Sequence, residues 1–170
     1  MPASVTCRPA LPADADAIAR IYNQGIEDRS ATFETRPRAA PDVLPWLEGL
    51  PRAIVAEIGG RVVAFAATSA YSSRDCYEGV REVSIYVDRA ARGRGAGRAV
   101  GEALVRAAED AGCWKLVSKI FVENAASRRL VRSLGFREVG VHERHARLDG
   151  RWRDVVVVER LLGGARDGTP

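Results

Sequence analysis

The spacing of apolar residues along this chain alternates between a helical and an extended period. A recurrence every three or four residues predicts amphipathic helices: one opened by Pro12, a short one over 43–50 that Pro45 starts or interrupts, and two more over 95–111 and 124–134. Short apolar or alternating runs predict strands over 5–8, 53–58, 61–69, 81–87, 116–122, 139–148 and 152–160. The order β-α-α-β-β-β-α-β-α-β-β indicates a single α/β domain with a mixed β-sheet flanked by helices.

Glycines mark the expected turns and ends of these elements. Gly59-Gly60 and Asp149-Gly150 each separate two predicted strands, and both pairs favour the two-residue turns of β-hairpins. Gly135 directly follows a predicted helix, where a glycine commonly ends a helix. The segment 25–41 between the first two helices is polar and irregular, so we expect a loop there.

The composition narrows the class of protein. A chain of 170 residues, 46% of them hydrophobic, fits one domain, which we place at residues 1–162 with a flexible tail at 163–170. The longest apolar run, Val62 to Ala67, is far too short to cross a bilayer, and the N-terminus lacks the apolar core of a signal peptide. Three scattered cysteines give neither a disulfide framework nor a zinc site. We therefore expect a cytoplasmic protein without a membrane segment.

Positive charge comes almost wholly from arginine. Of 26 lysine and arginine residues only Lys115 and Lys119 are lysines, and the net charge is +4. A surplus of this size does not indicate a nucleic-acid partner, and we expect none. The planar guanidinium group suits phosphates and carboxylates, whereas a general compositional bias would explain the arginine excess equally well.

The densest chemical signal is the glycine–arginine loop, residues 88–98 (DRAARGRGAGR), between a predicted strand and a predicted helix. Glycines there allow successive backbone N–H groups to point into one concavity, and the start of the helix adds the positive end of its dipole. The loop lacks the Gly-Lys-Ser/Thr ending of a P-loop and the full spacing of a Rossmann fingerprint. It predicts a site for a polyanion, most simply a pyrophosphate, with a tight turn of solvated charges as the alternative.

Two motifs resemble those of the GNAT acyl-CoA N-acyltransferase superfamily. Residues 92–97 (RGRGAG) match its R/Q-x-x-G-x-G/A loop, and residues 124–130 (NAASRRL) with Gly135-Phe136 match its N-x-x-S/A-x-x-L…G-F/Y segment. The resemblance extends from Arg8 to about Leu161. Within the superfamily the chain is most similar to the phosphinothricin, methionine sulfoximine and arsinothricin N-acetyltransferases, on segments 21–23, 32–34, 82–87 and 150–155.

The resemblance implies acetyl-CoA as cosubstrate and no metal. It implies that N–H groups of the glycine–arginine loop hold the pyrophosphate, that Ile85 and Val87 lie along the pantetheine, and that the Val87 N–H polarises the thioester oxygen. Asn124 would contact the pantetheine, cap the following helix, or do both. The residues implied to bind the cofactor are Ile85, Val87, Arg92, Gly93, Arg94, Gly95, Ala96, Gly97, Arg98, Asn124 and Ser127.

Glu82 is the residue that the resemblance implies as general base. Strand alternation places Glu82, Ser84 and Tyr86 on one face, and a carboxylate that points into a cleft is costly unless it has a task or a cation. An ion pair with a neighbouring arginine is the alternative. Many members of the superfamily carry a tyrosine as thiolate acid where this chain has Val131, so the proton donor stays open between Tyr86, water and no donor.

Three residues are expected to bind the acceptor: Phe33, Arg74 and Tyr77. Arginine suits a carboxylate or an anionic head group, and the resembling enzymes contact the substrate carboxylate from the loop that holds Arg74. A solvated charge at Arg74 and a core anchor at Phe33 are the alternatives. His142 and His145, three apart on a predicted strand, are expected to face opposite sides and to stay outside the chemistry.

The sequence therefore predicts an N-acetyltransferase that moves acetyl directly from acetyl-CoA to the α-amine of a small glutamate-like amino acid. Phosphinothricin, methionine sulfoximine and arsinothricin are the acceptors that the resemblance implies, and it also implies a homodimer. Acetylation of protein N-termini or of another amine is the second possibility. A CoA-binding regulatory domain without catalysis is the third, and the presence of Glu82 argues against it.

Overall fold

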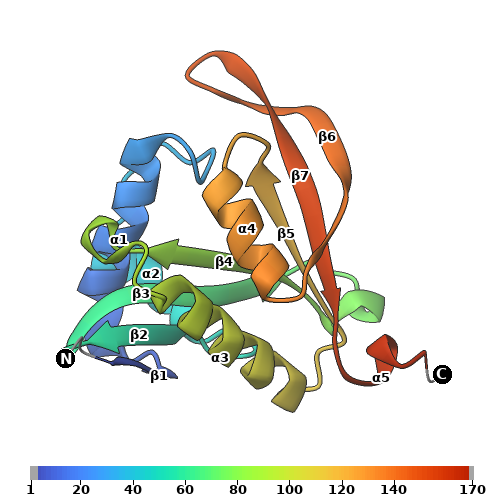
Figure 1. Cartoon of the computed structure of the whole chain (residues 1–170), viewed down its shortest axis with the longest axis horizontal. Coiled ribbons are helices and arrows are strands. Elements are labelled where there is room, and N and C mark those ends of the chain that lie inside the picture. Colours follow the sequence, from blue (N-terminus) through green and yellow to red (C-terminus); the bar gives the residue numbers. More distant parts are fainter. Residues whose placement is uncertain (1–3, 169–170) are drawn as a thin grey trace.

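Seven strands form one sheet in the computed structural model, which describes residues 4–168. The strands are β1 (Val5–Pro9), β2 (Ile54–Ile58), β3 (Arg61–Ala70), β4 (Val80–Val87), β5 (Lys115–Phe121), β6 (Arg137–Leu148) and β7 (Arg151–Leu161). Their order across the sheet is β1-β2-β3-β4-β5-β7-β6, and of these described strands only β4 and β5 pair in parallel. A mixed sheet flanked by helices confirms the predicted fold class (Figure 1).

The helices are α1 (Ala15–Asp28), α2 (Ala40–Leu47), α3 (Ala96–Asp110), α4 (Ala125–Ser133) and the single turn α5 (Gly163–Arg166). α1 continues past residue 25, so the predicted loop began too early. α2 starts before the predicted residue 43, because the Asp42 carboxylate accepts the Ala39 N–H at 2.8 Å and caps the first turn. Within residues 4–168, no helix is both long and apolar enough to cross a membrane.

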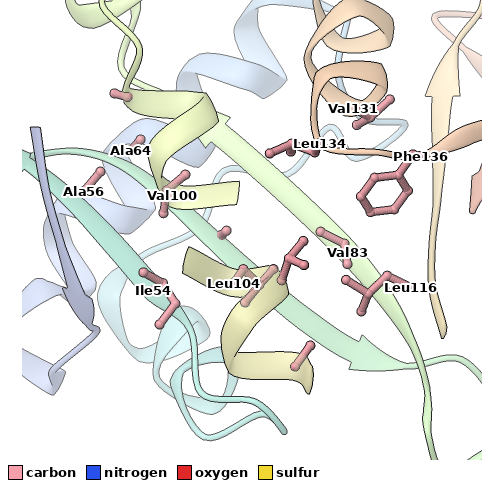
Figure 2. Packing of buried hydrophobic residues seen from close by; sticks show 14 of the residues in the cluster. Ile54, Ala56, Ala64, Val83, Val100, Leu104, Leu116, Val131, Leu134 and Phe136 are labelled. Atoms are coloured by element: carbon pink, nitrogen blue, oxygen red, sulfur yellow. The ribbon is translucent and has the colours of Figure 1, made fainter. Parts of the chain in front are cut away.

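Helices cover both faces of the sheet, and each face has its own hydrophobic core. On one face, α3 packs Val100 and Leu104 against strand residues that include Ala64 and Val83 (Figure 2). On the other face, α1 and α2 pack against β2 and β3, where Phe65 is fully buried. Burial of a large aliphatic or aromatic side chain contributes about 1.5–3 kcal/mol, so these two cores fix the position of β4 between them.

The hydrophobic core under α1 and α2 does not extend over β5, β7 and β6. On this part of the sheet Phe121 and Val155 form a smaller cluster with Leu148, and Phe33 packs on it from the segment between α1 and α2. This end of the molecule therefore leaves room for a cleft beside β5.

Gly101 lies where α3 meets the end of α4. A Cβ at this position would stand 2.5 Å from Cδ1 of the buried Leu134. We expect Gly101→Ala to lower the free energy of unfolding by about 1–3 kcal/mol, although alanine normally favours a helix over glycine. Urea unfolding measures the change. Gly140→Ala, with open space around the glycine, is the control and is expected to stay within about 0.5 kcal/mol; greater stability of Gly101→Ala would contradict the prediction.

Both predicted two-residue turns are present. Gly59 and Gly60 join β2 to β3 with φ values of 59° and 75°, and Asp149 and Gly150 join β6 to β7 with φ values of 50° and 76°. Positive φ at both central residues is the geometry of a type I′ turn, so the glycine pattern predicted these hairpins correctly.

β6 contains an irregularity that strand alternation did not predict. Its register with β7 shifts between His142 and Ala146, where Arg144 has a φ of 48° and donates its N–H to Asp154 Oδ1 at 2.7 Å. A bulge interrupts the alternation of side chains between the two faces of a strand. The ring centroids of His142 and His145 lie 5.1 Å apart, so the expectation that they face opposite sides was wrong.

The stretch 163–170 begins with α5, where we expected a flexible tail. Arg166 of this turn lies 4.0 Å from a carboxylate oxygen of Glu109 on α3. The last two residues, 169 and 170, lie outside the described residues. Flexibility of this stretch stays a prediction.

Candidate active site

A gap in the sheet opens between β4 and β5. The two strands pair only over residues 80–82 and 115–117, and beyond this point they diverge (Figure 1). Where they diverge, the Ser118 hydroxyl donates a hydrogen bond of 2.9 Å to the Val83 carbonyl. In the described part of the chain, the rest of β4 has no strand beside it on this edge, and it borders a cavity.

This first cavity, of about 360 Å³, lies between the end of α1, β4, the glycine–arginine loop and the N-terminal ends of α3 and α4. It is lined by ten of the residues predicted to bind the cofactor: Ile85, Val87, Arg92, Gly93, Gly95, Ala96, Gly97, Arg98, Asn124 and Ser127. Arg94 is exposed and lies outside the lining, so its contact with the cofactor stays a prediction. Asp28, Ser30 and Ala31 also line the cavity. The sequence did not indicate these three because we placed them in an irregular loop.

Two glycines give the loop its backbone shape. Gly93 and Gly95 have φ values of 74° and 83°, in the left-handed region that favours glycine. Gly95 is the N-cap of α3, so no capping side chain accepts the first N–H groups of that helix. Unsatisfied N–H groups at the positive end of a helix dipole suit a phosphate.

The arginines of this loop are partly engaged by α1. Arg89 and Arg92 each form an ion pair with Asp28, at 2.7 Å and 2.6 Å. Burial would raise the pKa of the Asp28 carboxyl, but hydrogen bonds from Arg92 and Arg89 outweigh it and hold the pKa below its usual value. Arg92 therefore lines the cavity with part of its charge already neutralised, and the backbone carries more of the expected anion binding than the arginine count suggested.

Asp88 fixes the start of the loop. This buried carboxylate accepts the Ala90 N–H at 3.0 Å and pairs with Arg20 of α1 at 2.6 Å. Burial alone would raise the pKa of Asp88, but the Arg20 guanidinium and the Ala90 N–H lower it below its usual range. The charged carboxylate ties the loop to α1, and removing Arg20 would leave the buried Asp88 charge without this partner, which is costly.

Asn124 joins α4 to the end of α1. Its Oδ1 accepts the Ser127 N–H at 3.1 Å, and its Nδ2 donates to the Ser30 carbonyl at 2.9 Å. The first bond is the predicted N-cap of α4, whereas the second bond was not predicted. Asn124 thus holds two walls of the first cavity together and lines it at the same time.

A second, narrower cavity of about 80 Å³ continues from the first along β4. The residues that line both cavities are Ala31, Ile85, Tyr86, Asn124, Ser127 and Leu130. Tyr86 packs edge-on against Tyr22 and stacks on Phe65, with centroid distances of 5.0 Å and 5.4 Å. Burial raises the pKa of the Tyr86 phenol above its usual value. The group therefore carries its proton at neutral pH.

Glu82 forms an ion pair with a lysine, whereas the expected alternative to a catalytic role was an ion pair with an arginine. Lys119 Nζ lies 3.0 Å from Glu82 Oε1, on the neighbouring strand β5. Lys119 also lines the second cavity, as Ser84 does. Sequence reasoning missed Lys119 as a site residue, and the available signal was its rarity as one of two lysines in the chain.

The three residues predicted to bind the acceptor do not share one pocket. Tyr77 lines a third cavity of about 330 Å³ that also includes Lys119 and His142. Arg74 is exposed, with its guanidinium 5.9 Å from the centre of the Tyr77 ring. Phe33 packs edge-on against Phe121 with a centroid distance of 4.7 Å, at the far end of β5, so the core-anchor alternative describes its contacts.

Two features indicate the class of this protein: the parallel strands β4 and β5 diverge, and a glycine-rich loop with a helix N-terminus lies at the gap between them. The sequence model of the acetyltransferase (GNAT) family matches residues 18–136, which include both motifs. The chain belongs to this family and is an N-acetyltransferase.

Individual relatives cover nearly the whole chain. The L-methionine sulfoximine/L-methionine sulfone acetyltransferase of Salmonella typhimurium is 32% identical over 163 residues, which are 93% of this chain and 95% of that protein. A phosphinothricin acetyltransferase from Sinorhizobium meliloti, solved in complex with acetyl-CoA, superposes with a TM-score of 0.89 at 29% identity over 98% of this chain and 92% of that one. A ribosomal-protein-alanine N-acetyltransferase from Brucella melitensis gives a TM-score of 0.87 at 31% identity over 92% of this chain and 99% of that one.

Proposed function

We propose that this protein transfers acetyl from acetyl-CoA to the α-amine of a small glutamate-like amino acid of the phosphinothricin, methionine sulfoximine or arsinothricin type. The observation that carries the proposal is the pair of adjoining cavities that leads from the glycine–arginine loop to the wall formed by Ser84 and Lys119, beside Glu82. The acetyl-CoA and phosphinothricin named for the Sinorhizobium meliloti relative support the choice of cofactor and acceptor.

In this proposal the cofactor lies along the free edge of β4. The pyrophosphate meets the N–H groups of the loop and of the first turn of α3, while Arg92 and Arg98 add charge. Beyond Glu82, β4 has lost its pairing with β5. Its backbone is free to pair with the pantetheine. Val87, whose N–H the resemblance implies as the donor to the thioester oxygen, lies at the loop end of β4, five residues from Glu82. The Ile85 N–H is therefore the proposed donor, because Ile85 lines both cavities and lies nearer to Glu82.

Glu82 is the proposed general base. Its carboxylate takes a proton from the acceptor ammonium, directly or through water, and the amine then attacks the thioester carbon. The C–N bond forms as the C–S bond breaks, and the thiolate of CoA leaves. Tyr86 lines both cavities and keeps its proton. It is therefore the proposed donor to the thiolate, in place of the tyrosine that Val131 replaces.

An acceptor screen that follows thiol release from acetyl-CoA tests the substrate. We expect phosphinothricin or methionine sulfoximine to give a kcat/KM at least about tenfold above that of a peptide with an N-terminal alanine, since the latter must fit a longer chain beside Glu82. The Brucella melitensis neighbour makes that peptide the sharpest competitor. Activity on the peptide and on none of the amino acids would overturn the substrate, and CoA binding without any thiol release would support a regulatory domain.

The proposal includes the cytoplasmic homodimer that the resemblance implies. Exposed apolar side chains near the third cavity, Tyr71, Val139 and Tyr77, support association on that face.

A further inference from the structure

Lys119 presents a primary amine to the carboxylate that the proposed function uses as its base. We propose that Lys119 is a self-acetylation site, which takes the acetyl group from bound acetyl-CoA when no acceptor is present. The inference rests on the proposed function, because it uses the same cofactor and the same base.

The position of Lys119 carries the argument. It lines the second cavity together with Ser84 and Tyr86, and that cavity continues from the one beside the glycine–arginine loop. A thioester held at Ile85, which lines both cavities, therefore lies in the cavity that Lys119 lines. The side chains of Lys119 and Glu82 are 37% and 34% exposed, and Lys119 lines the second cavity as well as the third. A molecule bound in the second cavity can therefore contact the amine.

The geometry between Lys119 and Glu82 is that of an amine and its base. Nζ to Oε1 is 3.0 Å, within the range in which a general base takes a proton. An acceptor amine has to occupy the same side of Glu82, and therefore competes with Lys119 for the carboxylate.

Lys115 provides an internal comparison. It is the only other lysine of the chain and lies four residues earlier on β5. Lys115 pairs with Glu159 at 2.9 Å and lines the third cavity without lining either of the first two. The remaining basic side chains of the sequence, apart from two histidines, are arginines, whose guanidinium stays protonated and is not a nucleophile.

The reaction balances without any further reactant. The Lys119 ammonium gives one proton to Glu82, and the free amine attacks the acetyl carbonyl carbon. A C–N bond forms, the C–S bond of acetyl-CoA breaks, and the second nitrogen proton accompanies the leaving thiolate to give CoA thiol. Glu82 then returns its proton to solvent.

Acetylation removes the positive charge of Lys119 and leaves Glu82 without its partner. The acetamide also occupies the side of Glu82 that an acceptor amine must reach. The modified protein is therefore expected to turn over acceptor more slowly, so that acetyl-CoA in the absence of acceptor limits the activity of the enzyme.

Mass spectrometry of the full chain after incubation with acetyl-CoA tests the proposal. We expect one added acetyl group, located at Lys119 because trypsin no longer cleaves there, at a rate about a hundredfold above that at Lys115. Phosphinothricin in the same incubation is expected to slow the labelling. Lys119→Arg and Glu82→Gln are expected to remain unmodified, and Lys115→Arg to be labelled like the natural sequence.

Three results would overturn self-acetylation at Lys119. They are equal labelling of Lys115 and Lys119, unchanged labelling in Glu82→Gln, and no label at Lys119 in a protein that acetylates phosphinothricin. The last result leaves the proposed function intact. If Lys119 is labelled but no amino acid causes thiol release, the result supports self-acetylation at Lys119 and overturns the proposed acceptor.

Discussion

Glu82→Gln is expected to lower kcat for acetyl transfer by about 10²–10⁴-fold, the usual contribution of a general base, and to leave the Kd for CoA unchanged. Glutamine keeps the shape of the side chain and an oxygen that can accept a hydrogen bond from the Lys119 ammonium, which lies 3.0 Å from Oε1 of Glu82. It cannot take a proton from the acceptor. The first cavity, which is proposed to bind the cofactor, is lined by other residues, so the affinity for CoA is expected to stay the same.

Two measurements separate these effects. Thiol release at saturating acetyl-CoA and acceptor gives kcat, and calorimetry with CoA gives Kd. Glu48→Gln, an exposed carboxylate at the end of α2, is the matched control and is expected to leave both values unchanged. A kcat equal to that of the natural sequence in Glu82→Gln would remove Glu82 from the role of base and leave it as the partner of Lys119.

Local patterns predicted the elements of the fold because their causes are local. The Gly59-Gly60 turn, the Asn124 cap and the start of α3 after Gly95 each depend on one or two residues whose backbone preference is known. The shape of the glycine–arginine loop is local in the same way, and a glycine-rich loop followed by a helix is suited to an anion through its own backbone. Binding of the cofactor there stays a prediction. The pyrophosphate of acetyl-CoA as the bound anion came from the family resemblance.

The acceptor side of the site depends on contacts that no local pattern contains. The Glu82–Lys119 pair joins two strands that meet only for three residues before they diverge. The approach of His142 to His145 depends on a bulge in β6. Phe33 was expected to bind the acceptor, with a core anchor as the alternative, and it packs on Phe121 in the cluster with Leu148 and Val155.

Ion pairs explain the role of several arginines near the glycine–arginine loop. Arg20, Arg89 and Arg92 hold the glycine–arginine loop to α1 through Asp88 and Asp28. Charge that suggested a polyanion therefore serves in part to position the loop. We therefore expect anion binding to depend mainly on the backbone conformation of the glycine–arginine loop.

Gly93→Ala and Gly95→Ala are each expected to raise the Kd for CoA about tenfold, and together about a hundredfold. Both glycines have positive φ, at 74° and 83°, and a Cβ at either position would meet no atom within 4 Å. The effect therefore comes from the backbone alone. A non-glycine residue in this region costs on the order of 1–3 kcal/mol, and about 1.4 kcal/mol corresponds to tenfold in affinity.

Gly59→Ala and Gly60→Ala provide the matched control for these loop variants. These glycines also have positive φ and open space around them, but they lie in the β2–β3 turn. Alanine is expected to lower the free energy of unfolding there without changing the Kd for CoA, because the turn does not line the cofactor cavity. Calorimetry with CoA and urea unfolding on all four variants measure both quantities. If the two pairs change Kd equally, the effect is general destabilisation; if only the loop pair changes it, the conformation of the glycine–arginine loop is what binds the cofactor.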